Sequence, residues 1–277
     1  MFTLNCKGRL LVVDKPMVMG ILNITPDSFY AGSRVEGIDA VLKQAGKMLD
    51  DGADILDVGG QSSRPGSERV SVEKELNRLM PALEAIAGKF PGAFISIDTY
   101  FSKVAREAVA AGASMVNDIS AGTMDAEMIP SVASLQVPYI LMHMKGEPGT
   151  MQHKPEYDDV TKEILDFFIF KSAGLKKAGI HDIIIDPGFG FGKTIDQNFR
   201  LLKNLDLLKT MELPVLAGIS RKSSIYKTLG VSADESLNGT TVMNTIALLN
   251  GASILRVHDV KEAKEAIKIL EKYQSVR

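Results

Sequence analysis

A carboxylate that ends an apolar run, Asp186, has clear binding chemistry. The run Ile183-Ile184-Ile185 precedes it, and a glycine-rich segment with Phe189 and Phe191 follows it. An unpaired carboxylate in apolar surroundings is costly, so Asp186 should have a partner. A ligand with adjacent N–H donors, arranged as in guanidine, would suit it, and a phenylalanine ring could stack on that ligand. The alternative is an aspartate that caps its own loop, beside two core phenylalanines.

The segment 59–66, Gly-Gly-Gln-Ser-Ser-Arg-Pro-Gly, has the chemistry of an anion-binding loop. Backbone N–H groups and hydroxyls can hold phosphate oxygens while Arg64 adds charge-assisted hydrogen bonds. A serine- and glycine-rich turn with its arginine in solvent is the alternative. The glycine-rich segment 186–193 lacks the spacing and the Lys-Ser/Thr pair of a nucleotide-binding loop, so nucleotides are not the expected anion.

Cations and hydroxyls also gather in segments 220–223, Ser-Arg-Lys-Ser, and 256–258, Arg-Val-His. Alternation along a strand places Arg256 and His258 on the same side. Together the two segments favour a polyanionic leaving group. The alternatives are a solvated arginine or lysine in the first segment and a histidine that caps a helix in the second.

The elements that must position these residues alternate along the whole chain. Eight short runs rich in Val, Ile and Leu predict strands at residues 18–23, 54–60, 94–99, 115–119, 139–144, 182–188, 215–220 and 254–259. Segments with helical periodicity lie between or after them, at 39–50, 72–87, 102–111, 157–178, 196–209, 236–249 and 260–272, with a short fourth helix at 125–134 that Pro130 interrupts.

This alternation predicts an α/β fold, a single (β/α)8 TIM barrel that spans residues 1–277 as one domain. Two apolar stretches, 2–5 and 10–13, predict an N-terminal hairpin over about residues 2–13 that plugs the N-terminal end of the barrel. An open doubly wound sheet is the alternative, but no Gly-x-Gly-x-x-Gly sequence opens a first βα unit.

The carboxyl ends of all strands in a parallel barrel open onto one face, where active sites lie. Eight polar residues at or near the ends of the predicted strands are therefore expected on one rim: Asn23, Asp57, Asp98, Asn117, His143, Asp186, Ser220 and His258.

Composition excludes several other classes. The net charge is −2 with mixed basic and acidic residues, so we expect no nucleic-acid partner. The single cysteine, Cys6, excludes an intramolecular disulfide and a cysteine-rich zinc site, which favours a cytoplasmic location. No stretch of about 18 apolar residues predicts a membrane span.

Seven ordered blocks at the strand ends resemble the dihydropteroate synthases. They are the segments 23–29, 59–66, 97–99, 117–119, 186–193, 220–223 and 256–259. The match runs from the first barrel strand to the last, and the ordered set is far more specific than any one block. One block departs from the family pattern, because Gln61 and Ser63 stand where glutamate and threonine are usual; Ser63 keeps the hydroxyl, whereas Gln61 removes a charge.

The resemblance implies a transferase of folate biosynthesis. It would condense 6-hydroxymethyl-7,8-dihydropterin pyrophosphate with p-aminobenzoate to 7,8-dihydropteroate and pyrophosphate, and sulfonamides would compete with p-aminobenzoate. Carried onto this sequence, the pterin would be held by Asp98, Asn117, Asp186, Lys222 and Arg256, and pyrophosphate by Asn23, Ser63, Arg64 and His258. The p-aminobenzoate site would comprise Arg64, Pro65, Phe191, Lys222 and Ser223. The catalytic residues would be Asp98, Lys222, Arg256 and His258; Mg²⁺ would bind Asn23 and pyrophosphate; and the protein would be a homodimer.

Three other functions compete with this one. A pterin-binding methyltransferase that serves a corrinoid has no use for the two anion-binding blocks. A catalytically silent pterin-binding paralogue should have lost anion residues, but Asn23, Asp27, Arg64 and His258 are present. A Schiff-base aldolase would need a lysine at the site, whereas Lys222 is expected beyond its strand in a polar loop.

Overall fold

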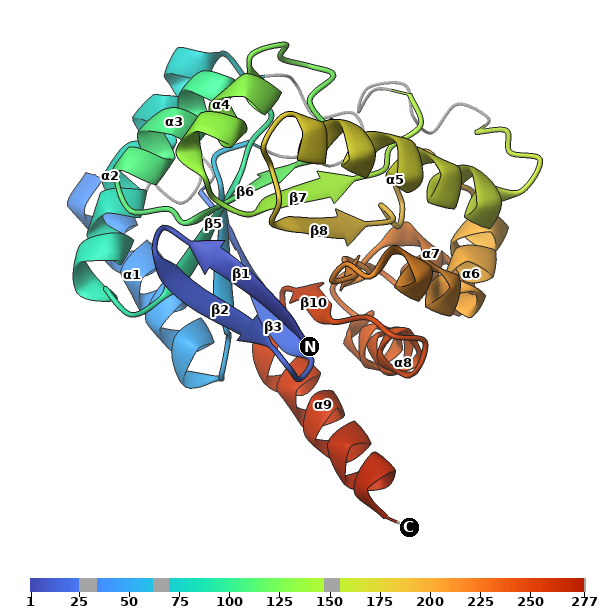
Figure 1. Cartoon of the computed structure of the whole chain (residues 1–277). Helices are drawn as coiled ribbons and strands as arrows, with labels where there is room; N and C mark the ends of the chain where they lie inside the picture. The colour runs from blue at the N-terminus through green and yellow to red at the C-terminus, as the bar shows by residue number, and fades with distance from the viewer. Residues whose placement is uncertain (25–33, 62–69, 147–154, 277) are drawn as a thin grey trace.

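The computed structural model describes residues 1–24, 34–61, 70–146 and 155–276. Eight parallel strands form its centre and helices surround them (Figure 1). The strands are β3 (Met17–Asn23), β4 (Ile55–Gly59), β5 (Phe94–Asp98), β6 (Met115–Asp118), β7 (Tyr139–Met142), β8 (Ile183–Asp186), β9 (Leu216–Ala217) and β10 (Ile254–Val257). Each lies within the predicted run or begins one residue before it.

The pairing of the strands establishes a barrel. Neighbouring strands follow chain order from β3 to β8, and β3 also pairs with β10, which pairs with β9. A parallel bridge between Ile185 and Val215 joins β8 to the residue before β9. The predicted (β/α)8 barrel is therefore confirmed. An open doubly wound sheet would leave two free edges, whereas here the first and last strands lie side by side.

An antiparallel hairpin covers one end of the barrel, as predicted (Figure 1). Its strands are β1 (Phe2–Cys6) and β2 (Arg9–Val13). The buried hairpin residues pack with seven strand residues that open the interior, namely Met19, Ile55, Met115, Ile140, Ile184, Leu216 and Ile254. The N-terminal half of the barrel is thus filled with apolar side chains.

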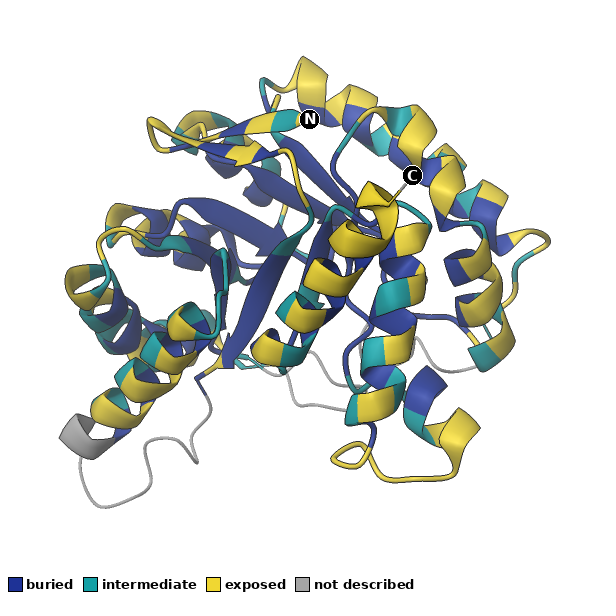
Figure 2. Ribbon diagram, turned by 90° about the horizontal axis from the view of Figure 1, so that it is seen from below, coloured by how far each residue is buried: buried dark blue, intermediate teal, exposed yellow. Residues whose placement is uncertain are grey.

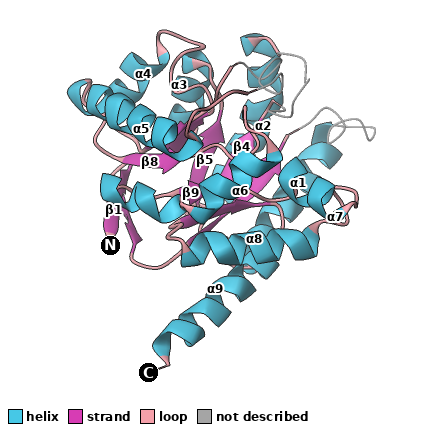
Figure 3. Ribbon diagram, turned by 90° about the vertical axis from the view of Figure 1, so that its right-hand side faces the viewer, coloured by secondary structure: helices cyan, strands magenta, loops and turns pink. Residues whose placement is uncertain are grey.

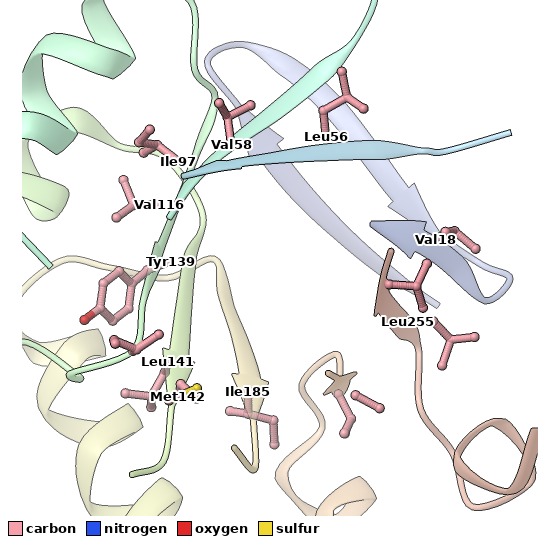
Figure 4. Close-up of a cluster of buried hydrophobic side chains, with 14 of the residues drawn as sticks. Val18, Leu56, Val58, Ile97, Val116, Tyr139, Leu141, Met142, Ile185 and Leu255 are labelled. Carbon is pink, nitrogen blue, oxygen red and sulfur yellow. The ribbon is translucent and has the colours of Figure 1, made fainter. Parts of the chain in front are cut away.

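The apolar strand residues that alternate with these face the helices. Figure 4 shows this outer cluster, in which Val18, Leu56, Val116, Leu141 and Leu255 lie against one another or the helical layer. Because side chains alternate across a strand, the residue two places after each inner apolar residue also faces inward. The inner positions nearest the carboxyl ends are therefore available for polar groups.

The helices present buried faces to the strands and exposed faces outward (Figure 2). They are α1 (Arg34–Asp50), α2 (Val72–Lys89), α3 (Ser102–Ala110), α4 (Met128–Leu135), α5 (Val160–Lys177), α6 (Ile195–Lys203), α7 (Ser223–Leu229), α8 (Leu237–Leu249) and α9 (Val260–Ser275). No described helix is long and apolar enough to cross a membrane.

Capping residues explain where several helices begin. Asp159 accepts hydrogen bonds from the backbone N–H groups of Thr161 and Lys162 at 2.9 and 3.1 Å, so α5 starts after it and not at the predicted residue 157. Thr194 and Gln197 form a capping box that starts α6. Pro130 lies in the first turn of α4, where its missing N–H is tolerated, and does not interrupt the helix.

One helical prediction was wrong, and one helix was missed. The segment 196–209 was expected as one helix, but α6 ends at Lys203 and a 3-10 helix, Leu205–Met211, follows. Helix α7 was not predicted, because it has only seven residues and follows a polar segment. It packs against α6 and α8 (Figure 3) and begins directly after Lys222.

Candidate active site

A buried arginine joins two carboxylates at the centre of the barrel's open end. The Nε atom of Arg256 donates to Asp57 at 2.6 Å, and its Nη2 atom donates to Asp98 at 2.6 Å. Asp57 and Arg256 lie two positions after an inner residue of their strand, and Asp98 lies four positions after one. Alternation along the strand therefore directs all three side chains inward. Burial alone would lower the pKa of Arg256, but Asp57 and Asp98 together raise it, and the guanidinium stays charged.

Asp57 was not among the residues assigned to a ligand, yet it connects the group. Its Oδ2 atom also accepts a hydrogen bond from the Asn117 side chain at 3.0 Å. Among the described residues its Oδ1 atom has no hydrogen-bond partner, although it is fully buried. The available signal was a charged residue inside an apolar run, two places after Ile55. A buried polar atom without a partner is what a ligand donor can satisfy.

Burial raises the pKa of Asp98 to about 7, against the opposing effect of Arg256. Asp57, Glu75 and Asp118 add to the rise because their negative charges disfavour another one nearby. Asp98 can therefore exchange a proton near neutral pH, and a ligand with a positive charge would favour its ionised form.

Asp186, the last residue of β8, faces the same space. Its Oδ1 atom accepts the backbone N–H of Gly188 at 2.7 Å, so the aspartate also caps its own loop, as the alternative interpretation expected. Burial raises its pKa, and the cations Lys222 and Arg256 oppose that rise. Gly218 is the inner residue between the two strands, and a Cβ atom there would lie 3.7 Å from Asp186 Oδ2 and 3.9 Å from Arg256 Cβ. Gly218 therefore adds no side chain between Asp186 and Arg256.

Lys222 turns into the barrel and does not lie in a solvated loop. It is the residue before α7, half-buried, and its Nζ atom donates to the Phe189 carbonyl. The ammonium lies 4.5 Å from the centroid of the Phe191 ring, within the range of a cation–π interaction. Burial lowers its pKa to about 8, while Asp186 opposes this. Ser223 follows as the first residue of α7 and is also half-buried.

Strands β9 and β10 bring a hydroxyl and an imidazole together. Ser220 Oγ lies 3.0 Å from His258 Nδ1 and accepts the His258 backbone N–H at 3.2 Å. The neighbouring Arg221 does not join them, because it forms a bidentate ion pair with Asp259 at 2.9 and 2.8 Å. The expected group of two cations beside His258 therefore loses one member.

The other predicted residues fall into three groups. Asn23 is exposed at the carboxyl end of β3, and Phe191 is buried beside Lys222. Ser63, Arg64 and Pro65 lie outside the described residues. His143 was expected on the rim, and this was wrong: alternation turns it toward α5, where its ring lies 4.9 Å from that of Phe167. It is 7% exposed, as the alternative of a near-core histidine predicted.

Behind Asp98, on the helix side of the barrel, lies a buried glutamate that sequence analysis missed. Glu75 of α2 is 1% exposed and forms a side-chain hydrogen bond with Thr99. Its Oε1 atom has no hydrogen-bond partner in the described part of the chain. Burial raises its pKa to about 7. The sequence gave no signal of this burial, because Lys74 and Arg78 lie close to Glu75 along the helix and suggest a solvated charged face.

The stability of the fold should depend on the protonation of Glu75. Its pKa is about 7 in the fold and 4.5 as its ordinary value, so it stabilises the fold fully below pH 4.5 and loses this contribution as the pH rises through 7. The free energy of unfolding of Glu75→Gln, relative to that of the wild-type protein, should therefore rise by about 2 kcal/mol between pH 5 and pH 8. Urea unfolding at both pH values measures this, with Glu84→Gln on the exposed face of α2 as the control. A difference that is independent of pH would contradict it.

The family assignment follows from comparison with known proteins. A family model described as pterin binding enzyme matches residues 19–258. The chain belongs to this family. Its relatives include the dihydropteroate synthase of Escherichia coli K12, which is 44% identical over 267 residues. The alignment covers 96% of this chain and 94% of the relative.

Solved structures agree with this assignment. Xanthomonas albilineans dihydropteroate synthase with 4-aminobenzoic acid is 40% identical and superposes with a TM-score of 0.92, covering 99% of both chains. Yersinia pestis dihydropteroate synthase in a sulfonamide drug complex is 41% identical with a TM-score of 0.93, covering 99% of this chain and 100% of the other. The resemblance to dihydropteroate synthases is thereby confirmed, in preference to a corrinoid-dependent methyltransferase.

Proposed function

We propose that this protein condenses 6-hydroxymethyl-7,8-dihydropterin pyrophosphate with p-aminobenzoate. The observation that carries the proposal is the polar layer above the apolar plug, in which Asp57, Asp98, Asn117, Asp186 and Arg256 all face inward. A pterin presents a row of ring N–H donors and acceptors on a flat aromatic surface. Carboxylates and an amide at the edge of a buried space, with a guanidinium beside them, match that pattern.

Asp186 supplies two acceptor oxygens for the pterin's adjacent N–H groups, and Lys222 and Asn117 supply donors for its oxygen and nitrogen acceptors. The planar guanidinium of Arg256 can lie against the ring face while its ion pairs with Asp57 and Asp98 hold its orientation. Asp98 lies where a positive charge on the pterin would be stabilised.

The reaction needs no protein nucleophile. The bond between the pterin methylene and the pyrophosphate oxygen breaks, and its electron pair leaves with pyrophosphate. The resulting cation is delocalised over the pterin, and the amine lone pair of p-aminobenzoate then forms the new C–N bond and releases a proton. Asp98 stabilises the cation, while Arg256 and His258 stabilise the developing negative charge of the leaving group.

Pyrophosphate would lie toward Asn23 and His258. The residues present fit a Mg²⁺ ion bound mainly through pyrophosphate oxygens, because the amide oxygen of the exposed Asn23 is the kind of hard ligand that Mg²⁺ prefers. The described residues contain no cluster of three His, Cys, Asp or Glu side chains that could hold a metal by themselves. When bound, Mg²⁺ would offset the charge of the leaving group.

The p-aminobenzoate site would be formed by Phe191, Lys222 and Ser223. The Phe191 ring lies under the Lys222 ammonium, and the start of α7 presents Ser223 with its hydroxyl and backbone N–H. The Xanthomonas relative was solved with 4-aminobenzoic acid and the Yersinia relative with a sulfonamide drug, which supports an aromatic-amine site of this kind.

A product assay tests the function directly. Purified protein with pterin pyrophosphate, p-aminobenzoate and Mg²⁺ should yield dihydropteroate and pyrophosphate in equal amounts, detected by mass spectrometry. A sulfonamide should compete with p-aminobenzoate and not with the pterin substrate, and its aniline nitrogen should give a pterin adduct. Absence of dihydropteroate from folded protein with both substrates would refute the proposal.

The reaction should lose rate in alkali because Lys222 loses its charge. The pKa of Lys222 is lowered to about 8, mainly by burial, so the ammonium present below pH 8 disappears above it. We expect kcat/KM for p-aminobenzoate to fall about tenfold for each pH unit above 8. Lys222→Arg, which keeps its charge, should be slower but should lack this alkaline limb. An identical limb in both proteins would show that another group titrates.

We further infer a homodimer that forms through α8 and α9. Val242, Ile246 and Leu249 lie at helical spacing on α8 and are 52, 38 and 51% exposed, and Ile269 on α9 is 71% exposed. An apolar face of this kind is suited to a second copy of the same surface. Replacing Ile246 with glutamate should give a folded monomer in analytical ultracentrifugation, whereas Ile169→Glu on α5 should not. A monomeric wild-type protein would contradict the inference.

The cytoplasmic location and the lack of a nucleic-acid partner stay predictions.

A further inference from the structure

A buried lysine that was not assigned to any ligand contacts the backbone of the amine site through the Phe191 carbonyl. Lys193, at the end of the glycine-rich segment, is 3% exposed. Its Nζ atom donates to the Gly188 carbonyl at 2.9 Å and to the Phe191 carbonyl at 3.0 Å, and it lies 3.1 Å from His143 Nδ1. The ammonium group therefore lies within hydrogen-bond distance of two carbonyls of the turn and of the imidazole, and the His143 carbonyl is 3.5 Å away.

The segment that Lys193 holds is an unusual backbone turn. Gly188, Gly190 and Gly192 all have positive φ values, of 68, 80 and 61°. Added Cβ atoms at the first and last of these would lie only 1.9 and 2.2 Å from the carbonyl oxygens of His143 and Lys145. The turn is therefore pressed onto the backbone that follows β7. Within the turn, the Phe191 backbone N–H donates to the Gly188 carbonyl at 3.1 Å, and Lys193 is a second donor to that carbonyl.

Two other side chains fix the same turn from its edges. Asn198 accepts the Gly190 backbone N–H at 2.7 Å, and the Tyr157 hydroxyl donates to the Gly192 carbonyl at 2.9 Å. Lys193 differs from both because its ammonium contacts the turn at its start, Gly188, and again toward its end, at Phe191.

The same turn also contacts Lys222. Lys222 Nζ donates to the Phe189 carbonyl, and its ammonium lies over the Phe191 ring. Phe189 lies between the two carbonyls that Lys193 binds, and Phe191 carries the second of them. A shift of the turn would therefore move both the aromatic surface and the cation of the amine site.

We propose that Lys193 is a positioning residue for p-aminobenzoate, which sets the Phe191 ring and Lys222 by binding the Gly188 and Phe191 carbonyls, with His143 as its fixed third partner. This inference rests on the proposed function. His143 is suited to the task because its ring is held between Lys193 and the edge of Phe167. Burial lowers the pKa of Lys193, and the negative charge of Asp186 opposes this.

The decisive measurement separates the two Michaelis constants. Lys193→Met should raise KM for p-aminobenzoate by roughly tenfold, the effect of one or two lost buried hydrogen bonds, and KM for pterin pyrophosphate by less than about threefold. Lys264→Met is the matched control, because it removes a partly buried lysine that pairs with Asp54 at 2.6 Å. It should leave both constants unchanged. A structural role alone would lower the melting temperature and the fraction of active protein without a change in either KM.

A second pair of variants keeps the inference testable if Lys193→Met does not fold. His143→Gln offers Lys193 an acceptor oxygen in place of Nδ1, whereas His143→Leu offers none. The leucine variant should show the larger KM for p-aminobenzoate. Equal constants for both, or for Lys193→Met and the wild-type protein, would overturn this inference while the wild-type protein still makes dihydropteroate. Failure of the wild-type protein to make product would instead refute the proposed function.

Discussion

Replacing Arg256 with methionine should lower kcat/KM by about a thousandfold or more and destabilise the fold by roughly 3–5 kcal/mol. The side chain is the partner of two carboxylates, Asp57 and Asp98, at 2.6 Å each, and Asp57 has no exposed side-chain surface. Removing one partner from a buried ion pair leaves an uncompensated charge, which is more costly than never having formed the pair. The proposed pterin stacking surface and the stabilisation of the leaving group are lost at the same time.

Two further variants make this prediction specific. Arg9→Met removes an arginine with hydrogen bonds to the carbonyls of residues 91–93 at the opposite end of the barrel, and it should leave kcat/KM unchanged. Adding Asp57→Asn to Arg256→Met should restore part of the lost stability, because it removes one uncompensated charge, but should not restore activity. Urea unfolding and steady-state kinetics measure the two effects. An Arg256→Met protein with wild-type stability would show that the network does not hold the charges as described.

Replacing Asp186 with asparagine should weaken pterin binding by roughly 1.5–3 kcal/mol, or about 10- to 150-fold in dissociation constant. An amide presents one acceptor oxygen and one donor, so it cannot accept from two adjacent ring N–H groups. The fold should survive, because the remaining oxygen can still accept the Gly188 backbone N–H that Oδ1 accepts in the wild-type protein.

Calorimetry with a pterin fragment measures this effect without requiring turnover. Asp182→Asn is the matched control: Asp182 precedes the same strand at its other end, where its carboxylate accepts the Asn5 backbone N–H at 3.0 Å. It should leave pterin affinity unchanged. Equal affinity of Asp186→Asn and the wild-type protein, both with unchanged melting temperatures, would remove Asp186 from the pterin site.

Periodicity in the sequence determined the fold and the side of the barrel on which most site residues lie. Each strand could be located by its apolar run, and once the barrel is accepted, alternation alone directs Asp186 and Arg256 inward from Ile184 and Ile254. The same rule, applied to Ile55, directs Asp57 inward, in agreement with its predicted place on the rim. Applied to the outward-facing Tyr139 and Leu141, it would have excluded His143 from the rim.

The tertiary structure decided which of these residues meet. Arg256 and Asp57 are 199 positions apart, and they form an ion pair because β10 pairs with β3 and β3 with β4. The burial of Glu75 and Lys193 could not be read from their neighbours in the sequence. It arises where α2 packs on β4 and Glu75 meets Thr99, and where the glycine-rich turn folds onto the backbone after β7. Local pattern specifies the direction of a side chain along its own strand or helix. Its partners, and hence its charge state, depend on which distant strands and loops the closed barrel brings beside it.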